Sequence, residues 1–324
     1  MKKTYFITIA LIASWQLAIA QQEQMYTQFM YNKLVWNPAY AGSFESPTLT
    51  AVYRNQFVGL DGAPKTYALS FNTAYQEEAE RIAFGVNLSQ HSIGITRILN
   101  LDLMPLTYMI AMRYGTLSAG FQVSVRQFSQ NWGDDRLQPL QPNGDLAIPI
   151  EDNTKIIVNT GAGIFYKTFT NTWYAGFAMP RMLRSNIDFS QVGTGDKVSR
   201  EVQHFNAMGG YTFTPNDNLA ITPQTLLKYA KGAPFQADIN VTLLFKNKFS
   251  GGITYRTGGG ETSSAGESVD LLLGLQATNK FFFCLSYDLS LTPLRRYHSG
   301  SVELTARYWF NPPALDTDDI RSPY

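Results

Sequence analysis

The feature that most constrains the fold is an alternation of apolar and polar residues in segments of about ten residues. In Ser301–Phe310, every second residue from Val302 to Phe310 is apolar, and the residues between them are mostly polar and carry both signs of charge. Successive side chains of a β-strand point to opposite faces, so one face of this segment is apolar throughout. The same alternation returns in Phe235–Phe245. Such segments, with aromatic residues at their ends, are typical of transmembrane β-strands.

The composition favours a membrane barrel over a soluble domain. Charged residues make up 16% of the chain and aromatic residues 14%, whereas ordinary soluble domains carry roughly 25% charged residues. The formal net charge of +1 gives no polybasic signal, so no nucleic-acid partner is expected. A length of 324 residues allows two soluble domains or one large β-structure.

The first twenty residues predict a signal peptide. Lys2 and Lys3 give a positive start, Tyr5–Leu17 is largely apolar, and Ala18-Ile19-Ala20 supplies the small residues of a cleavage site. The one cysteine, Cys284, is far from that site, so neither a lipid anchor nor an intramolecular disulfide is expected. No later apolar run reaches about 18 residues, which argues against a helical membrane protein. The mature chain is therefore expected to be secreted, periplasmic or inserted as a barrel.

We predict an all-β fold, a single transmembrane antiparallel β-barrel of about 14 strands. The predicted strands are 49–57, 66–73, 83–90, 102–114, 117–127, 156–166, 173–179, 204–213, 219–229, 235–245, 249–256, 268–277, 281–289 and 301–310. Four regions follow from this assignment. They are a signal peptide (1–20), an N-terminal periplasmic arm (21–48), the outer-membrane barrel (49–310) and a C-terminal tail (311–324).

The connections between these strands differ in length according to their order. The even-numbered connections are short, whereas odd-numbered ones such as Phe128–Lys155 and Pro180–Gln203 are mostly longer. An even number of strands with short turns at one rim and long loops at the other is the layout of transmembrane barrels. A secreted β-sandwich would not need this sorting. Within two of the strands, Pro105 and Pro223 each predict a bulge or a break, because proline cannot donate to the ladder.

The arm 21–48 is rich in aromatic residues but has no clean period, and Asn37-Pro38 and Gly42 interrupt it. We therefore expect a folded arm or short helix rather than a strand. Its Met, Tyr and Trp residues are of the kind that anchor protein interfaces. The candidate partner-binding residues are Tyr26, Phe29, Met30, Tyr31, Trp36, Asn37, Pro38 and Tyr40.

If the apolar faces meet lipid, the opposite faces place charged residues in the lumen. The candidate lumen charges are Arg126, Lys228, Asp238, Arg256, Asp270, Asp288, Glu303 and Arg307. Unpaired buried charge is costly, so a paired network that fills the interior is one interpretation. A solute pathway is the other, because a barrel of about fourteen strands is near the size at which an aqueous pore becomes possible. Occlusion by the N-terminal arm is a further possibility for such a barrel.

The sequence offers little for catalysis, and we expect no enzyme, no cofactor and no metal site. His91, His204 and His298 are scattered, without the spacing of metal ligands, and no Gly-x-Ser-x-Gly occurs. An outer-membrane hydrolase would use His204 or His298, but nothing singles out a partner serine. Asp134-Asp135 lacks the spacing of a calcium-binding EF-hand loop.

Several motifs resemble one known family. They are Gln28–Asn32 followed by Asn37–Gly42, Tyr53–Thr66, Leu226–Tyr229 with Lys231–Pro234, Ser286–Asp288, and Arg321–Pro323. Together they are similar to the PorP/SprF family, which usually has Trp at the position of Phe57. The motifs are spread over nearly the whole mature chain, and the first two are the most specific.

The resemblance implies an outer-membrane barrel of the type IX secretion system of Bacteroidota, in some members tied to gliding motility. It implies association with periplasmic lipoprotein and ring components and with secreted cargo, such as adhesins, that has a type B C-terminal domain. It brings no catalytic residue. We expect a non-enzymatic component that supports secretion or surface attachment of cargo; a passive porin is the alternative, and a hydrolase is less favoured.

The expected topology assigns a role to each rim. The first strand would rise from the periplasm, which would place both termini inside and the odd-numbered loops outside. The long loops would then contact cargo, while residues 21–42 and the tail 311–324 would face periplasmic partners. The outward faces of the strands would contact outer-membrane lipid.

Overall fold

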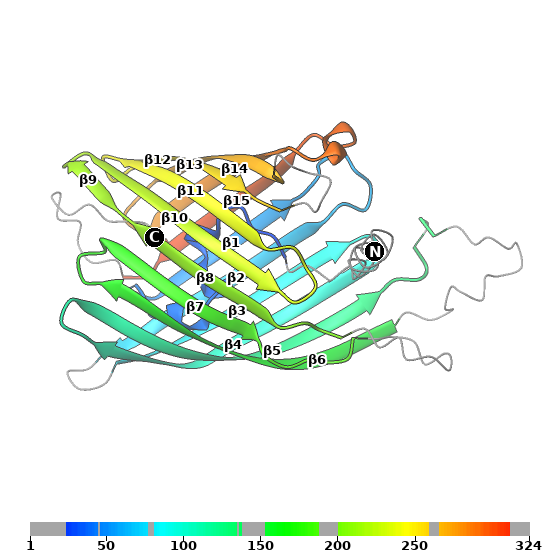
Figure 1. Cartoon of the computed structure of the whole chain (residues 1–324), viewed down its shortest axis with the longest axis horizontal. Helices are drawn as coiled ribbons and strands as arrows, with labels where there is room; N and C mark the ends of the chain where they lie inside the picture. Colours follow the sequence, from blue (N-terminus) through cyan, green and yellow to red (C-terminus); the bar gives the residue numbers. More distant parts are fainter. Residues whose placement is uncertain are drawn as a thin grey trace, which may run out of the picture.

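A computed structural model describes residues 24–44, 46–76, 81–134, 136–137, 153–187, 200–258 and 266–311. The chain forms one closed antiparallel barrel, in which the last strand pairs with the first and β11 pairs with β10 (Figure 1). Two short strands, β8 and β9, lie end to end against β10 and form one interrupted strand. The wall therefore has fourteen strands, as the sequence predicts.

The strands are long and pair with their neighbours in sequence. Their bounds are β1 (Thr48–Asn55), β2 (Lys65–Gln76), β3 (Arg81–Ile93), β4 (Thr96–Ala111), β5 (Gly115–Gln130), β6 (Asn153–Thr168), β7 (Trp173–Arg181), β8 (His204–Tyr211), β9 (Phe213–Asn216), β10 (Leu219–Ala230), β11 (Gln236–Phe245), β12 (Phe249–Arg256), β13 (Ser268–Gln276), β14 (Phe281–Ser290) and β15 (Ser301–Trp309). Each predicted strand is present, with shifted ends. The largest shift lengthens β3 and β4, so that Gly94-Ile95 alone joins them.

Strand pairing is irregular next to both Pro105 and Pro223, which lack a backbone N–H. At Pro105 the register between β4 and β5 shifts between Leu103 and Leu106, which is the predicted bulge. Pro223 stays in register with Val241 of β11. On the opposite edge of β10, the neighbouring strand is interrupted between β8 and β9. Proline cannot donate a ladder hydrogen bond, so one neighbouring strand loses its pairing at that point.

The two rims of the barrel differ as predicted. The connections at one end (the short-turn rim, at the left of Figure 1) have two to four residues, for example 217–218 and 246–248. The other end (the long-loop rim) carries the longest connections, 131–152 and 182–203, as well as the short 3-10 helix η4 (Pro293–Arg296). Parts of both long connections lie outside the described residues.

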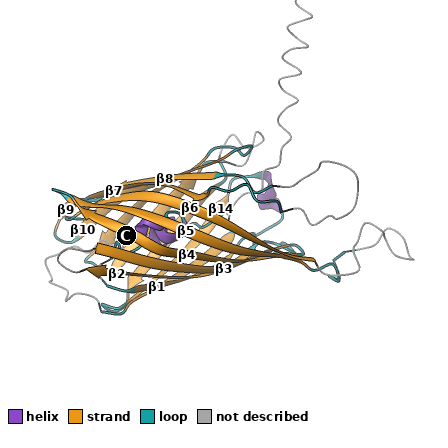
Figure 2. Cartoon of the chain, turned by 90° about the horizontal axis from the view of Figure 1, so that it is seen from below, coloured by secondary structure: helices purple, strands orange, loops and turns teal. Residues whose placement is uncertain are grey.

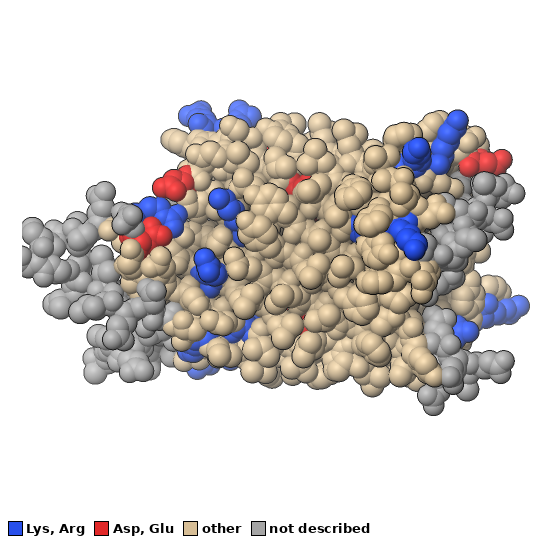
Figure 3. Space-filling model, turned by 180° about the vertical axis from the view of Figure 1, so that it is seen from behind, with Lys and Arg blue, Asp and Glu red and all other residues tan. Residues whose placement is uncertain are grey.

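The outer face of the barrel is apolar. Exposed side chains on this face include Leu103, Val158, Ile253, Leu273 and Leu285, with exposures from 40% to 72%. Figure 3 shows that Lys, Arg, Asp and Glu gather toward the two ends of the barrel, whereas its middle is almost free of them. None of the helices in the described residues has the length and hydropathy to cross a membrane. An apolar band between two polar rims is the surface that a lipid bilayer solvates.

The interior holds the segment that precedes the first strand. This inner segment (residues 24–44) contains three single-turn 3-10 helices, η1 (Phe29–Tyr31), η2 (Lys33–Val35) and η3 (Pro38–Tyr40), which lie within the ring of strands (Figure 2). Met30, Leu34 and Ala39 have 0% exposure. Burial of such apolar side chains is a dominant favourable term in folding.

The position of the inner segment differs from the periplasmic arm predicted for residues 21–48. It starts at the long-loop rim, where Met25 contacts Gln56 at the end of β1, and reaches the short-turn rim, where β1 begins at Thr48. The segment thus runs along the inside of the barrel instead of extending from it. The predicted signal peptide (1–20), and the predicted tail (311–324) beyond Asn311, lie outside the described residues.

Candidate functional site

One group of charges holds the start of the inner segment at the seam where the last strand meets the first. Arg54 of β1 lies 2.7 Å from Asp288 of β14 and 3.1 Å from Glu303 of β15. The Glu303 carboxylate also accepts hydrogen bonds from the backbone N–H groups of Thr27 (2.8 Å) and Gln28 (2.9 Å). Charged groups that are taken out of water must be compensated in this way. The barrel wall and the inner segment therefore share one ionic network.

A second group of charges continues this network along β10, β11 and β12. Asp238 accepts from Arg256 and from Lys228, each at 2.8 Å, and Arg256 also donates to the backbone oxygen of Tyr26 at 3.0 Å. Asp270 of β13 lies 3.9 Å from Arg256. The charges of the wall are thus paired with each other and with backbone groups of the inner segment.

Two further cations lie between the inner segment and the wall. Arg307 of β15 donates to the backbone oxygen of Tyr31 and to the hydroxyl of Thr50 at 3.3 Å. Lys33, which belongs to the inner segment, donates to the backbone oxygen of Met30 at 2.9 Å and lies 4.6 Å from the ring centroid of Tyr174. Carbonyl oxygens and aromatic faces are favourable partners for buried cations.

On the other side of the barrel the inner segment packs against glycine. A Cβ added at Gly120 of β5 would lie 2.6 Å from the backbone nitrogen of Ala39, and one at Gly163 of β6 would overlap the side chain of Asn37. Asn37 caps η3 by accepting from the Ala39 N–H (2.9 Å) and donates to the Ile164 carbonyl (2.9 Å). Glycine at these wall positions is what permits the close approach of the two backbones.

The long connection between β7 and β8 closes the wall network near the long-loop rim. Its residue Glu201 pairs with Arg126 of β5, lies 3.5 Å from Arg181 of β7 and accepts from Asn159 of β6 at 2.6 Å. The same connection contributes Ile187 to a small apolar cluster with Phe128 of β5 and Ile157 of β6. A residue of a long connection is thereby paired with a charge of the barrel interior.

The eight candidate lumen charges all lie on the inner side of the wall. They are Arg126, Lys228, Asp238, Arg256, Asp270, Asp288, Glu303 and Arg307. Sequence reasoning missed two of their partners, Arg54 and Glu201. The inward alternation of β1 carried the signal for Arg54, whereas a lone acid in a long loop gives no signal for Glu201.

The eight candidate partner-binding residues lie where occlusion of the barrel by the N-terminal arm would place them. Tyr26, Phe29, Met30, Tyr31, Trp36, Asn37, Pro38 and Tyr40 are all buried inside the barrel. Buried side chains present no surface to another protein, so their position lends no support to a role in partner binding. These residues fill part of the barrel interior and pack against its wall.

The three histidines do not come together. His91 shares a hydrogen bond with Thr66 (2.8 Å), His298 lies against the ring of Phe57 (4.6 Å between centroids), and His204 is buried at the start of β8. Among the described residues, no group of His, Cys, Asp or Glu has the arrangement of a metal site. Cys284 is a buried free thiol on the inner face of β14.

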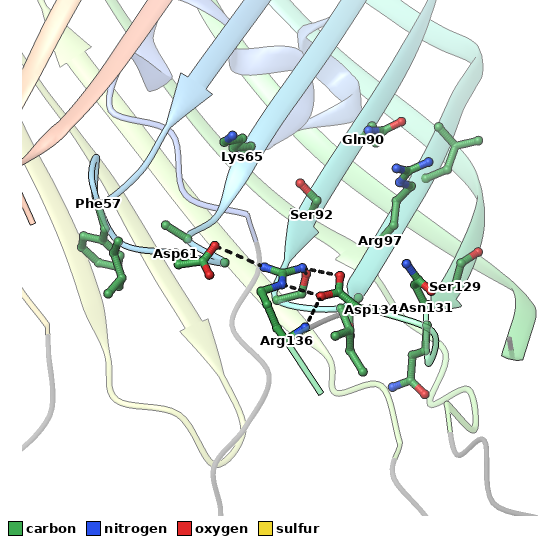
Figure 4. Close-up of a pocket in the computed structure, with 18 of the residues that line it drawn as sticks. Phe57, Asp61, Lys65, Gln90, Ser92, Arg97, Ser129, Asn131, Asp134 and Arg136 are labelled. Atoms are coloured by element: carbon green, nitrogen blue, oxygen red, sulfur yellow. Dashed lines mark hydrogen bonds and ion pairs between the residues drawn. The ribbon is translucent and has the colours of Figure 1, made fainter. Parts of the chain in front are cut away.

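A cavity of about 830 Å³ opens at the long-loop rim, outside the wall of β2–β5 (Figure 4). At its edge, Arg136 forms an ion pair with Asp134 (2.7 Å), lies 3.9 Å from Asp61 and donates to the Gly94 carbonyl (2.9 Å). The hydrogen bonds from Arg136 lower the pKa of Asp134 to about 2. A smaller cavity of about 150 Å³ lies at the short-turn rim, beside Lys167.

The comparison with known families decides the identity of this filled barrel. A family model described as "Type IX secretion system membrane protein PorP/SprF" matches residues 18–308. The chain belongs to the PorP/SprF family. This PorP/SprF protein is thus an outer-membrane β-barrel of the type IX secretion system. No match was found among curated proteins.

Solved structures similar to this PorP/SprF protein are also barrels. The Ralstonia pickettii toluene transporter TbuX has a TM-score of 0.49 and 10% identity, over 86% of this chain and 93% of its own. A Pseudomonas aeruginosa FadL homologue has a TM-score of 0.47 and 12% identity, over 92% and 98%. The CymD monoaromatic hydrocarbon channel has a TM-score of 0.47 and 10% identity, over 92% and 97%. At such scores the likeness carries no argument about function.

Proposed function

We propose that this chain is a non-enzymatic component of type IX secretion that works through its rims and supports the secretion or surface attachment of particular cargo. The observation that carries the proposal is the filled interior. The inner segment contacts the wall on both sides, through the Glu303 carboxylate and against Gly120 and Gly163. A barrel filled in this way has its rims, rather than a lumen, available for other proteins.

The two rims suit different partners. The long connections 131–152 and 182–203 give one rim the larger surface, and barrels of this kind direct long loops to the outside of the cell. We propose that cargo with a type B C-terminal domain, including adhesins and gliding-related proteins, is engaged there. The short-turn rim, where β15 ends, would then face the periplasmic lipoprotein and ring components.

The filled interior also bears on the alternative of a passive porin. Free diffusion through a porin needs a continuous aqueous path. The inner segment instead places apolar and aromatic side chains such as Phe29, Leu34 and Trp36 within the ring of strands. We therefore expect the purified protein to give no stable ion conductance in planar bilayers, and steady conductance by the wild-type protein would favour the porin.

A cellular experiment tests the proposal itself. The gene would be deleted, and proteins of the medium, cell surface and periplasm would be quantified by mass spectrometry. We expect loss of a small set of secreted proteins with type B C-terminal domains, with recovery when the gene is restored. An unchanged secreted and surface proteome in the deletion strain would contradict a role in secretion.

The orientation of the rims has a separate test. Two cysteine variants, Tyr297→Cys and Thr278→Cys, report on the two rims. Tyr297 is at the long-loop rim and is 70% exposed, and Thr278 is in an exposed turn at the opposite rim. The natural Cys284 is 1% exposed and gives little background. A membrane-impermeant maleimide should label intact cells at position 297 and label position 278 only after lysis. The reverse pattern would invert the assignment of the rims.

A further inference from the structure

The outer faces of β1–β6 carry a row of polar residues near the ends of these strands at the long-loop rim. Register brings six outward positions side by side, one on each strand, and they are Asn55, Lys65, Ser92, Arg97, Ser129 and Thr154. We refer to them as the polar row. Side chains alternate along each strand, and the neighbouring Arg54 and Thr66 point inward with 2% exposure each. The polar row therefore faces away from the lumen.

The next outward row, one step toward the membrane, has a mixed character. It consists of Tyr53, Tyr67, Gln90, Leu99, Gln127 and Ile156. The rings of Tyr53 and Tyr67 lie against each other, with centroids 5.1 Å apart. Tyrosine is enriched at the interface between lipid and water. One step further, Leu69, Leu88 and Val125 form part of a row that is wholly apolar.

The dimensions agree with this assignment of levels. Lys65 is ten residues from Tyr75, an outward aromatic residue at the short-turn end of the same strand. At ~3.4 Å per residue and a tilt of about 40°, these two positions are separated by roughly 26 Å along the membrane normal. An apolar band about 25 Å tall is typical of outer-membrane barrels. Lys65 thus lies at the level of the lipid head groups, and the polar row continues from it obliquely across the tilted strands.

Two cations of the polar row face the cavity of about 830 Å³ at this rim. Lys65 and Arg97 are exposed, and both pair with Ser92 in the register. Because two strand spacings separate them, their backbones are about 10 Å apart. Among the described residues, neither has an ion-pair partner within 4.0 Å. Arg136 of the same cavity, by contrast, is already paired with Asp134.

The remaining lining suits a head group with many hydroxyls. Amide and hydroxyl side chains occupy the space around the two cations, and they are Asn55, Gln90, Ser92, Gln127, Ser129 and Asn131. Figure 4 shows Lys65, Ser92, Gln90 and Arg97 along one side of the cavity, with Arg136 at its edge. Amides and hydroxyls can donate and accept hydrogen bonds to sugar oxygens, and Lys and Arg bind phosphate.

We propose that this cavity binds the phosphate-bearing sugar head group of a glycolipid in the membrane leaflet at the long-loop rim. Lys65 and Arg97 contact the phosphate, the amides and hydroxyls contact the sugar, and the acyl chains descend past Leu99 and Ile156. Basic pockets beside the apolar surface of membrane proteins bind anionic lipid head groups by the same combination of forces. The site lies outside the wall, so its occupancy is independent of the filled lumen.

Lipid titration of the purified full-length protein in detergent, followed by native mass spectrometry, tests this site. The probe is diphosphoryl lipid A, and the test variant is Lys65→Gln/Arg97→Gln. Each basic residue near a membrane surface contributes ~1 kcal/mol toward an anionic lipid, so the double variant should bind roughly 30-fold more weakly. The conservative variant Arg97→Lys, which keeps the charge, should retain most of the affinity.

The matched control removes two cations from the opposite rim. Arg113→Gln/Lys248→Gln changes the same charge at exposed positions next to Tyr114 and Phe249, and its affinity should equal that of the wild type. Heat-modifiable gel mobility verifies that each variant is folded. Equal binding by Lys65→Gln/Arg97→Gln and the wild type, or equal losses in both double variants, would overturn the proposal.

Two further probes separate the lipid from its parts. Dephosphorylated lipid A should bind weakly, because it lacks the group that the two cations recognise. Inorganic phosphate alone should compete poorly with lipid A, because it lacks the sugar and the chains. If dephosphorylated lipid A binds as well as lipid A, the site does not recognise phosphate. If inorganic phosphate at the same concentration as lipid A competes fully, the site does not recognise the lipid.

Discussion

The barrel holds its inner segment by two different kinds of contact on two sides of the wall. At the seam of β14, β15 and β1, the ion-paired Glu303 accepts hydrogen bonds from the backbone N–H groups of Thr27 and Gln28. At β5 and β6, glycines let η3 approach so closely that there is no room for a Cβ. The first contact depends on charged side chains, and the second depends on the absence of a side chain. We therefore expect removal of side-chain atoms to weaken the first contact and addition of side-chain atoms to weaken the second.

The largest effect is expected at the ionic side, from Glu303→Ala. The substitution leaves Arg54 with one carboxylate fewer and removes the acceptor of two backbone N–H groups. Breaking a buried charge pair by removing one partner costs roughly 3–5 kcal/mol. The free energy of unfolding in urea, followed by gel mobility, should fall by that amount, and planar bilayers should show new conductance.

The control for this variant is another acid-to-alanine change at an exposed site. Asp217→Ala lies in the turn between β9 and β10 and should change the free energy of unfolding by no more than about 0.5 kcal/mol. If Glu303→Ala and Asp217→Ala have the same urea midpoint, the seam network does not stabilise the barrel.

A smaller effect is expected at the glycine side, from Gly163→Ala. The new methyl group would overlap the Asn37 side chain and lie 3.0 Å from the Cβ of Ala178. Overpacking of this kind costs roughly 1–3 kcal/mol. The matched control is Gly251→Ala in β12, where the nearest atom is 4.0 Å from the added Cβ. Similar urea midpoints for the two variants would show that the close approach of η3 to the wall is not tight.

Combining Glu303→Ala with Gly163→Ala measures the energetic coupling between the two sides of the barrel. Sites that are far apart and independent give additive effects within about 0.3–0.5 kcal/mol. Here one continuous inner segment joins the sides, so release at the seam should relieve the crowding at Gly163. We expect Glu303→Ala/Gly163→Ala to lose less stability than the sum of the single losses, by more than that margin. Strict additivity would mean that each end of the segment is held separately.

The smallest effect is expected outside the barrel, from Asp134→Asn. Arg136 lowers the pKa of Asp134 from its ordinary value of 3.8 to about 2, so any contribution of this ion pair is complete above pH 4 and disappears as the pH falls through 2. Between pH 5 and pH 8 the pair should be constant. The variant should leave the urea midpoint unchanged but speed trypsin cleavage after Arg136. An unchanged cleavage rate would mean that the pair does not restrain this loop.

The sequence predicts the wall far better than its contents. The alternation of apolar and polar residues is a local signal. In Phe281–Ser290 it predicts both a strand and which face of that strand is apolar. The inner segment has no such period, because its three single-turn helices bury nearly all of their residues instead of one face. Its decisive contacts join residues that are 276 positions apart, such as Thr27 and Glu303. No local pattern carries that information, and a Met, Tyr and Trp-rich segment suits an interface as well as a core.

The seam contact has a consequence for how the molecule is assembled. The charged groups that hold Thr27 are Arg54, on the first strand, and Asp288 and Glu303, on the last two. The carboxylates that anchor Thr27 are therefore synthesised 261 and 276 residues after it. Ring closure and anchoring become a single late event, and a nascent polypeptide that stops before Ser301 has no means of completing either.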